Sequence, residues 1–159
     1  MQFLYAIYIF ILLKIILFKF GSVNPGFLWE QLRQSPDNVA RQLQWGNFAP
    51  LATISVSLRD LSVHSLVNLA GNIALFIPFG IFTYYLSSGS MSGGRRISVS
   101  GILLRALGLS LVLECAQALL GIGTFDVDDL LLNTLGGLLG YGVWRLLPQH
   151  SKKRPAREA

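Results

Sequence analysis

Four long apolar blocks constrain the fold of this chain more than any other feature. They cover residues 3–20, 66–86, 101–120 and 130–147. A helix needs roughly 17–25 residues to cross a bilayer, and each block has about that length. The chain is 52% hydrophobic and only 13% charged, well below the roughly 25% charge of an average soluble domain. We therefore predict an all-α, polytopic membrane helix bundle with about four transmembrane helices.

The first block also has the length of a signal peptide. However, no basic residue precedes it, and the sequence at its end, Phe18-Lys-Phe-Gly, is a poor cleavage site. We therefore expect an uncleaved span.

The segment that follows, residues 21–65, is polar at first and becomes apolar from Trp45. Its apolar half is too short to span and is broken at Pro50, so we expect an interfacial or re-entrant segment.

The basic residues lie in short flanks of the predicted spans. Residues 95–96 and 152–157 carry six of the 13 lysines and arginines and fall on one side of a four-span arrangement, whereas the loop 121–129 has none. By the positive-inside rule, both termini are cytoplasmic and this loop faces outward. We expect residues 1–147 to form one transmembrane domain and residues 148–159 to form a basic, disordered cytoplasmic tail. No continuous basic face forms, so nucleic acid is not an expected partner.

Polar and small residues recur at helical spacing on three of the four predicted spans. Because residues three and four apart share a helix face, each of these spans presents one polar stripe. All three stripes lie in the half of the membrane that we assign to the outside. We therefore predict that they converge on one outward-facing polar pocket, lined by Asn68, Asn72, Glu114, Gln117, Asp126, Asp128, Asp129 and Asn133.

Lys14 is a further candidate for the pocket. It lies roughly 9 Å below the end of the first block, and Glu114 lies roughly 10 Å below the end of the third, at a helical rise of about 1.5 Å per residue. Either charge alone in lipid is costly, so the two side chains could pair or jointly line the pocket. Alternatively, Lys14 extends along the lipid face toward the interface. The sequence leaves both alternatives open.

The same polar and small residues also have structural explanations. Asp128 or Asp129 is well placed to cap the fourth span, and the amides can hydrogen-bond between helices. One cap needs only one aspartate, however, and capping does not explain Glu114. Pro78 is expected to kink the second span, because it leaves the carbonyl near Ala74 without its helical donor. The residues expected to serve helix packing are Gly71, Pro78, Gly136, Gly137 and Gly140.

The three aspartates are weak candidates for a metal site. Asp126, Asp128 and Asp129 offer the oxygen ligands that Mg²⁺ and Ca²⁺ prefer, but their spacing lacks the glycine and terminal glutamate of an EF-hand. His64 stands alone before the second predicted span, so we interpret it as an interfacial residue rather than a metal ligand. Cys115 is the only cysteine, so no intrachain disulfide can form. No phosphate loop, nucleotide fingerprint or nucleophile elbow is present, and no cofactor is evident.

Four ordered motifs resemble the VanZ-like family of bacterial membrane proteins. They are Asn47-Phe-Ala-Pro, Asn68-Leu-Ala-Gly-Asn with the following Phe-Ile-Pro-Phe-Gly, Glu114-Cys-Ala-Gln, and Asp126-Val-Asp-Asp with the following Asn-Thr-Leu-Gly-Gly. Together they cover roughly residues 45–141. The chain departs from the family pattern at Leu51, where an aromatic residue is usual, and at Thr124, where many members have arginine.

The resemblance implies a role in the cell envelope and a place in the bacterial cytoplasmic membrane. The family is named for a member associated with low-level resistance to the lipoglycopeptide teicoplanin, and no reaction follows from it. Our first hypothesis is recognition of an envelope lipid, a lipid-linked precursor or an amphiphilic drug in the pocket. The second is a membrane enzyme that acts on a phosphate-containing lipid with carboxylate or metal assistance. The third is a structural or partner-binding protein whose glycine faces contact another chain, for which a second copy of this chain (a homo-oligomer) is one candidate.

Overall fold

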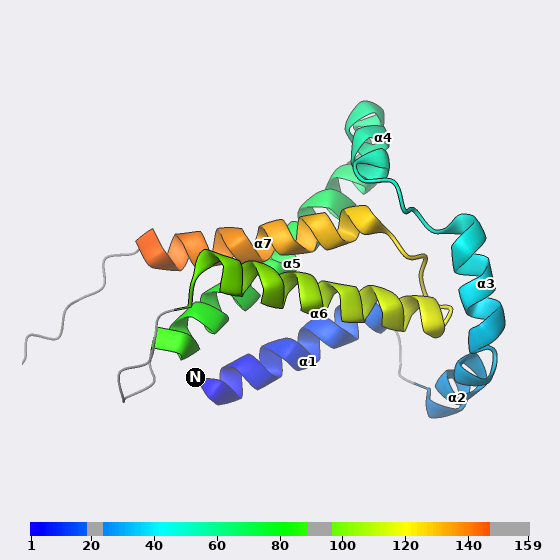
Figure 1. Ribbon diagram of the computed structural model, residues 1–159, viewed down its shortest axis with the longest axis horizontal. Helices are drawn as coiled ribbons and strands as arrows, with labels where there is room; N and C mark the ends of the chain where they lie inside the picture. The colour runs from blue at the N-terminus through cyan, green and yellow to red at the C-terminus, as the bar shows by residue number, and fades with distance from the viewer. Residues whose placement is uncertain (19–23, 89–96, 147–159) are drawn as a thin grey trace, which may run out of the picture.

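The computed structural model describes residues 1–18, 24–88 and 97–146, and these residues form seven helices and no β-strand (Figure 1). The all-α prediction is thus confirmed for the described part of the chain. The basic residues 95–96 and the basic tail, on which the predicted orientation depends, lie outside it. The helices are α1 (Gln2–Phe18), α2 (Pro25–Arg33), α3 (Ser35–Trp45), α4 (Ala52–Asp60), α5 (Val63–Ser88), α6 (Val99–Leu119) and α7 (Val127–Leu146).

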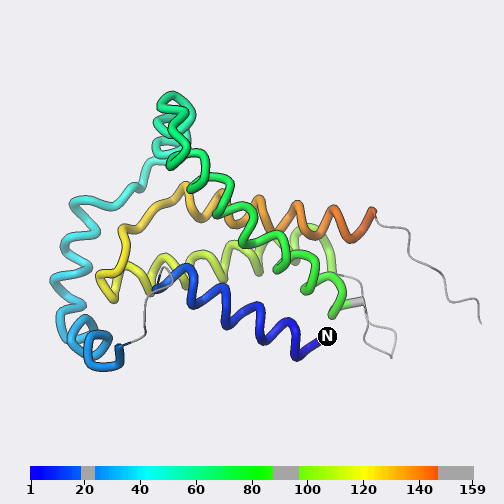
Figure 2. Tube along the Cα trace, turned by 180° about the vertical axis from the view of Figure 1, so that it is seen from behind, coloured from blue at the N-terminus to red at the C-terminus, as the bar shows by residue number. Residues whose placement is uncertain are grey.

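Four of these helices correspond to the four apolar blocks. By length and composition, α5 and α6 can cross a membrane, whereas α1 is apolar but has 17 residues. The 20-residue α7 begins with two aspartates in its first turn and is not among the helices that meet the same requirement. Both views show α1, α5, α6 and α7 running side by side as one bundle (Figures 1 and 2). Two of the four predicted spans are therefore long and apolar enough to cross a membrane.

The closest packing in the bundle joins α5 to α7. A Cβ at Gly136 or Gly140 would collide with the carbonyl oxygens of Ile73 or Ile77, and a Cβ at Gly80 would collide with the carbonyl of Gly137. Small residues allow helix backbones to approach this closely within a membrane. Gly137 also contacts α6, where its added Cβ would lie 2.8 Å from the Ala106 Cβ. The glycine face of α7 is therefore covered by helices of the same chain.

The bundle core forms where α1, α5 and α6 meet. Leu12 packs with Phe76 and Phe79, and the cluster is completed by Ala106 and Leu113. Dispersion contacts of this kind hold helices together where lipid offers no hydrophobic driving force.

α5 continues through Pro78. The Tyr8 hydroxyl donates to the Leu75 carbonyl at 2.7 Å, close to the expected kink.

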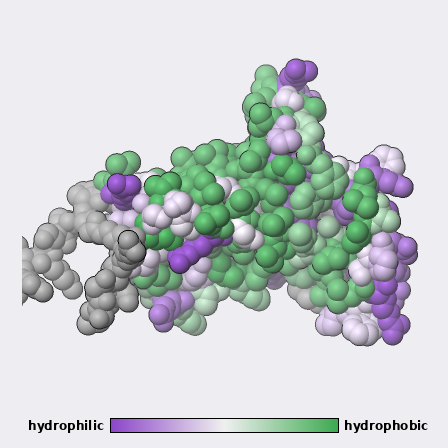
Figure 3. Space-filling view, viewed as in Figure 1, coloured by the Kyte–Doolittle hydropathy of each residue, from purple (hydrophilic) through white to green (hydrophobic). Residues whose placement is uncertain are grey.

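Three shorter helices form a crosswise group at one end of the bundle. Figures 1 and 2 show α2 and α3 beyond the ends of α1 and α6, while α4 projects from the bundle beside the start of α5. Polar side chains gather over α2 and α3, and apolar ones cover the middle of the bundle (Figure 3). Three helices thus lie within residues 25–60, where the sequence predicted an interfacial or re-entrant segment only for the apolar half that begins at Trp45.

α3 is anchored to the end of α6 by side-chain amides. Asn38 is fully buried, and its Nδ2 donates to the Leu119 carbonyl at 2.9 Å. Gln42 Nε2 donates to the Gly123 carbonyl at 2.9 Å, while its Oε1 accepts from Phe125 N at 2.7 Å. The chain reverses direction at Gly121, whose φ of 61° favours glycine. These bonds fix the loop between α6 and α7 against the crosswise helices.

A polar turn joins α4 to α5. Ser65 Oγ donates to Asp60 Oδ2 at 2.8 Å, and Ser62 Oγ accepts from Ser65 N at 3.2 Å. Hydrogen bonds from Ser62 and Ser65 hold the pKa of the exposed Asp60 carboxyl below its usual range. The carboxylate therefore stays charged beside the N-terminus of α5, where the helix dipole favours negative charge.

Alanine substitutions on the two sides of α7 should separate helix packing from helix propensity. Gly140→Ala places a methyl group against the backbone of α5, and we expect a loss of about 1–3 kcal/mol in the free energy of unfolding. Gly142→Ala meets no atom within 4 Å. It should leave stability unchanged or raise it by up to about 1 kcal/mol. Thermal unfolding of both variants in detergent checks this, and equal midpoints would contradict the packing account.

Candidate functional site

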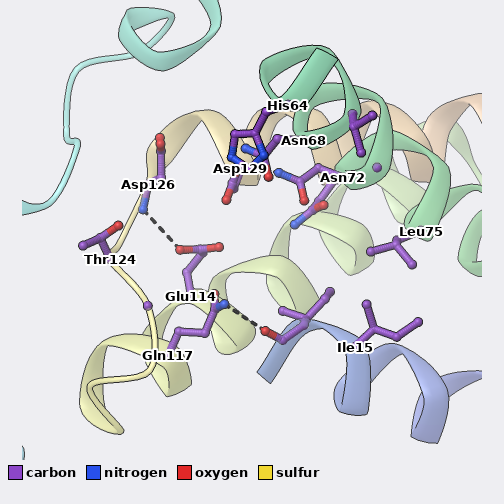
Figure 4. Close-up of a pocket in the computed structure, with 15 residues that line it drawn as sticks. Ile15, His64, Asn68, Asn72, Leu75, Glu114, Gln117, Thr124, Asp126 and Asp129 are labelled. Atoms are coloured by element: carbon purple, nitrogen blue, oxygen red, sulfur yellow. Dashed lines mark hydrogen bonds between the residues drawn. The ribbon is translucent and has the colours of Figure 1, made fainter. Parts of the chain in front are cut away.

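The structure contains a cavity of about 670 Å³ at the end of the bundle that carries the crosswise helices. It opens where the last turns of α1 and α6 meet the first turns of α5 and α7 (Figure 4). Most of the residues predicted for a polar pocket lie around it. The lining residues are Ile15, Ile16, His64, Val67, Asn68, Gly71, Asn72, Leu75, Glu114, Gln117, Gly123, Thr124, Asp126, Asp129 and Asn133.

Two predicted pocket residues, Lys14 and Asp128, are not among the lining residues. Lys14 is exposed on α1, and the described residues hold no ion pair between it and Glu114. Of the two alternatives that the sequence leaves open, pairing with Glu114 is therefore not formed, and the exposure of Lys14 favours the other, in which it lies on the lipid face. For Gly71 the sequence predicts a role in helix packing, but the structure places it in the cavity lining. No atom of another helix lies within 4 Å of the position that its Cβ would take.

Glu114 is the most buried of the carboxylates that line the cavity. Its side chain is 3% exposed, and its Oε2 accepts from Asp126 N at 3.1 Å. On the next turn, Gln117 Nε2 donates to the Ile16 carbonyl at 3.0 Å and so ties α6 to the end of α1 (Figure 4).

Amide side chains connect α5, α6 and α7 around the cavity. Asn72 Nδ2 donates to Asp129 Oδ1 at 2.5 Å, which joins α5 to α7. Asn133 Nδ2 donates to Ser110 Oγ at 2.8 Å, which joins α7 to α6. Asn133 is 3% exposed, and its Oδ1 has no hydrogen-bond partner among the described residues. The amides therefore act as interhelical links, but one buried acceptor beside the cavity is left unused.

Asp126 holds the segment after α3 against the start of α7. Asn47 and Asp126 form an isolated parallel bridge, with Asn47 N donating to the Phe125 carbonyl at 2.8 Å and Val127 N donating to the Asn47 carbonyl at 3.0 Å. Asn47 Nδ2 and Thr53 Oγ1 donate to the two Asp126 carboxylate oxygens at 2.8 and 2.7 Å. This aspartate thus closes one side of the cavity while its carboxylate is held by neighbours.

Asp128 is fully buried and caps a different helix from the one expected. Its Oδ1 accepts from Leu51 N at 2.5 Å and its Oδ2 from Ile54 N at 3.0 Å, at the first turn of α4. The start of α7 is capped instead by Asp126, whose Oδ1 accepts from Asp128 N at 2.8 Å. The prediction that Asp128 or Asp129 caps the fourth span is therefore wrong. The sequence could not show it, because the capped helix lies about 75 residues away in the chain.

These hydrogen bonds also bear on metal binding. Asp126 and Asp128 direct their carboxylates at Asn47, Thr53 and the backbone of α4. Within the residues that the structure describes, no group of three or more His, Cys, Asp or Glu side chains is placed to hold a metal ion.

Sequence reasoning missed several lining residues. His64 precedes Asn68 and Asn72 by four and eight positions, so helical spacing alone could have placed it on the same face of α5. Figure 4 shows it beside Asn68 and Asp129 at the cavity mouth. The apolar residues Ile15, Ile16, Val67 and Leu75 carried no comparable signal. Their place in the wall depends on how α1 packs against α5.

Two apolar helices long enough to span, within a bundle that surrounds a polar cavity, indicate the class of helical membrane proteins. A family model described as VanZ/LLP1 matches residues 5–148, and the chain belongs to this family. The resemblance seen in the four motifs is thus confirmed.

One curated relative can be compared directly. Protein VanZ of Enterococcus faecium is 31% identical over 83 residues, which cover 52% of this chain and 47% of that protein. The match therefore spans only about half the length of the relative. No solved structure matches the chain significantly.

Replacing Asp128 tests whether its two hydrogen bonds hold α4 in place. Asp128→Ala leaves the N–H groups of Leu51 and Ile54 without their acceptor, so we expect a loss of about 1–3 kcal/mol in the free energy of unfolding. Hydrogen exchange at Leu51 and Ile54 should also become faster. The matched change at an exposed position, Asp37→Ala, should cost less than about 1 kcal/mol. Similar losses and unchanged exchange would refute this role.

Proposed function

We propose that this protein recognises an amphiphile in the cavity: an envelope lipid, a lipid-linked precursor or a lipoglycopeptide. The observation that carries the proposal is the division of the cavity wall into two parts. Carboxylates and amides from α5, α6 and α7 form one part, and Ile15, Ile16, Val67 and Leu75 form the other. A polar headgroup fits beside the first and an acyl chain beside the second. The volume of about 670 Å³ lies within the usual range of ligand sites.

Family membership supports an envelope role for such recognition. The family is named for a member associated with teicoplanin resistance, and teicoplanin carries an acyl chain on a polar glycopeptide. Sequestering or masking an amphiphilic compound, or the precursor that it targets, would lower susceptibility without any chemical reaction. We therefore propose a contribution to glycopeptide resistance through binding.

The proposal includes a topology. We propose that α1, α5, α6 and α7 all cross the bacterial cytoplasmic membrane, with both termini in the cytoplasm and the cavity facing outward. The side-by-side bundle and the crosswise helices at its polar end support this arrangement (Figures 1 and 3). It gives α1 and α7 partners that shield their polar groups, as a spanning helix requires.

An impermeant thiol reagent can test this topology in intact cells. In a Cys115→Ala background, Thr124→Cys lies in the outward loop and should be labelled without permeabilisation. Ala159→Cys at the C-terminus should be labelled only after the membrane is opened. Labelling of both positions, or of the C-terminal one alone, in intact cells would overturn the orientation.

The two alternative functions have less support from the geometry. An enzyme would need acidic groups free to transfer protons or to hold metal, whereas Asp126 and Asp128 are engaged by neighbouring donors. A partner-binding protein was inferred from the glycine face of α7, and that face is covered by α5 and α6 within the chain. Binding of an amphiphile uses the groups that remain accessible in the cavity.

The proposed function predicts that Glu114 controls which lipids stay bound. Mass spectrometry of lipids retained by purified wild-type protein should reveal a specific set, and Glu114→Gln should deplete it several-fold, because a charge-assisted hydrogen bond is worth about 1.5–3 kcal/mol. Glu30→Gln, the same change on exposed α2, should retain the wild-type set. Teicoplanin susceptibility of a host that expresses each variant should follow the same order. Identical lipids and identical susceptibility in all three proteins would reject the proposal.

A further inference from the structure

A second cavity, of about 460 Å³, lies between α3 and the loop that joins α6 to α7. α3 contributes Asn38, Arg41, Gln42 and Trp45, whose spacing puts them on one face of the helix, and residues 121–124 complete the lining. We propose that this cavity binds the phosphate of a bilayer lipid, with Arg41 as the anion-binding group. Neither Arg41 nor Trp45 lines the larger cavity, so the two sites differ in their binding groups.

Buried contacts fix the position of the Arg41 side chain. Its Nη2 donates to Asn38 Oδ1. Asn38 is fully buried, and its Nδ2 donates to the carbonyls of Gln31 and Leu119 at 3.2 and 2.9 Å, so α2 and α6 hold it in place. A guanidinium carries its N–H donors in a rigid fork that matches the oxygens of a phosphate. The donors that do not bind Asn38 are therefore oriented in advance for an oxyanion.

Within the described residues, no acidic side chain forms an ion pair with Arg41. Asp37, one helical turn earlier, is the nearest acid in the sequence, yet the only hydrogen bond of the guanidinium in this part of the chain goes to Asn38. Of the eight acidic residues, seven belong to the described ranges and the eighth is Glu158, beyond α7. An anion that enters the cavity therefore meets a positive charge without displacing a carboxylate of these seven residues.

The loop adds an uncharged donor to the same cavity. Gln42 holds the loop against α3, because its Nε2 donates to the Gly123 carbonyl and its Oε1 accepts from Phe125 N. Figure 4 shows the Thr124 side chain directed away from Glu114, on the other side of the loop. The Thr124 hydroxyl has no hydrogen-bond partner among the described residues. A hydroxyl can donate to a phosphate oxygen, so Thr124 complements Arg41.

Exposed apolar side chains beside the cavity favour a lipid as the source of the phosphate. Trp45 is 76% exposed and Leu43 is 74% exposed. Tryptophan is enriched where the headgroups of a bilayer meet its hydrocarbon. α3 lies across the end of the bundle (Figures 1 and 2), which is the headgroup level in the proposed membrane arrangement. The inference rests on that arrangement and not on the amphiphile cavity, and it holds for either orientation because both leaflets carry lipid phosphate.

Arginine substitutions test the role of the guanidinium. Arg41→Gln removes the charge, whereas Arg41→Lys keeps the charge and removes the fork. Neither change alters the Asn38 Nδ2 that binds the end of α6. Arg59→Gln, at an exposed position on α4, is the matched control. Gel filtration and thermal unfolding would show that all three variants are folded before binding is measured.

The test is a calorimetric titration of the full-length protein in dodecyl maltoside, a detergent without phosphate. The probes are dihexanoyl phosphatidic acid, dihexanoylglycerol and inorganic phosphate. We expect saturable binding of the phosphatidic acid and affinities for the other two that are lower by roughly tenfold or more. Arg41→Gln should weaken binding of the phosphatidic acid by about tenfold or more, Arg41→Lys should weaken it less, and Arg59→Gln should not change it.

The contrary outcomes are distinct. Wild-type affinity for the phosphatidic acid in both Arg41 variants would place the binding elsewhere in the molecule and overturn the inference. Equal affinity for dihexanoylglycerol would exclude recognition of the phosphate, and equal affinity for inorganic phosphate would show a site for the free ion rather than for a lipid. Absence of saturable binding to the wild-type protein would also overturn the inference. The amphiphile proposal is tested separately, by the lipids that the Glu114→Gln protein retains.

Discussion

The close approach of α5 and α7 is the interaction on which the rest of the structure depends. Gly136 and Gly140 bring the α7 backbone against the carbonyls of Ile73 and Ile77. No larger residue fits there, so the helices are held in one register. That register places Asn72 opposite Asp129 at the end of the same interface. The polar wall of the cavity is thus a consequence of apolar packing farther along the two helices.

The turn between α6 and α7 extends this arrangement to the crosswise helices. Asp126 receives hydrogen bonds from Asn47 and Thr53, and Asp128 receives the first backbone N–H groups of α4. Two of the three aspartates therefore organise the structure at the end of the bundle. Glu114 and Asp129 also line the cavity, and each accepts a hydrogen bond from a neighbouring segment.

The sequence predicted the elements of the fold better than their contacts. Apolar block length located α1, α5, α6 and α7, and helical spacing brought Glu114 and Asn133 to the same cavity. Both signals are local, since they need only the geometry of one helix. The capping of α4 by Asp128 is not local, and neither is the apolar wall from α1. Such features depend on how distant segments meet, so spacing along the chain could not reveal them.

The central claim is that an amphiphile occupies the cavity between these helices. Gly71→Cys in a Cys115→Ala background places a thiol in the cavity, and Gly108→Cys places one on exposed α6; neither position has an atom that obstructs the new side chain. The direct measurement is the rate at which a thiol reagent modifies each variant with and without a bacterial membrane lipid extract or teicoplanin. The account predicts that at least one of them slows modification of the Gly71→Cys protein and leaves the Gly108→Cys protein unchanged. If neither addition changes the modification rate of the Gly71→Cys protein, the claim is contradicted.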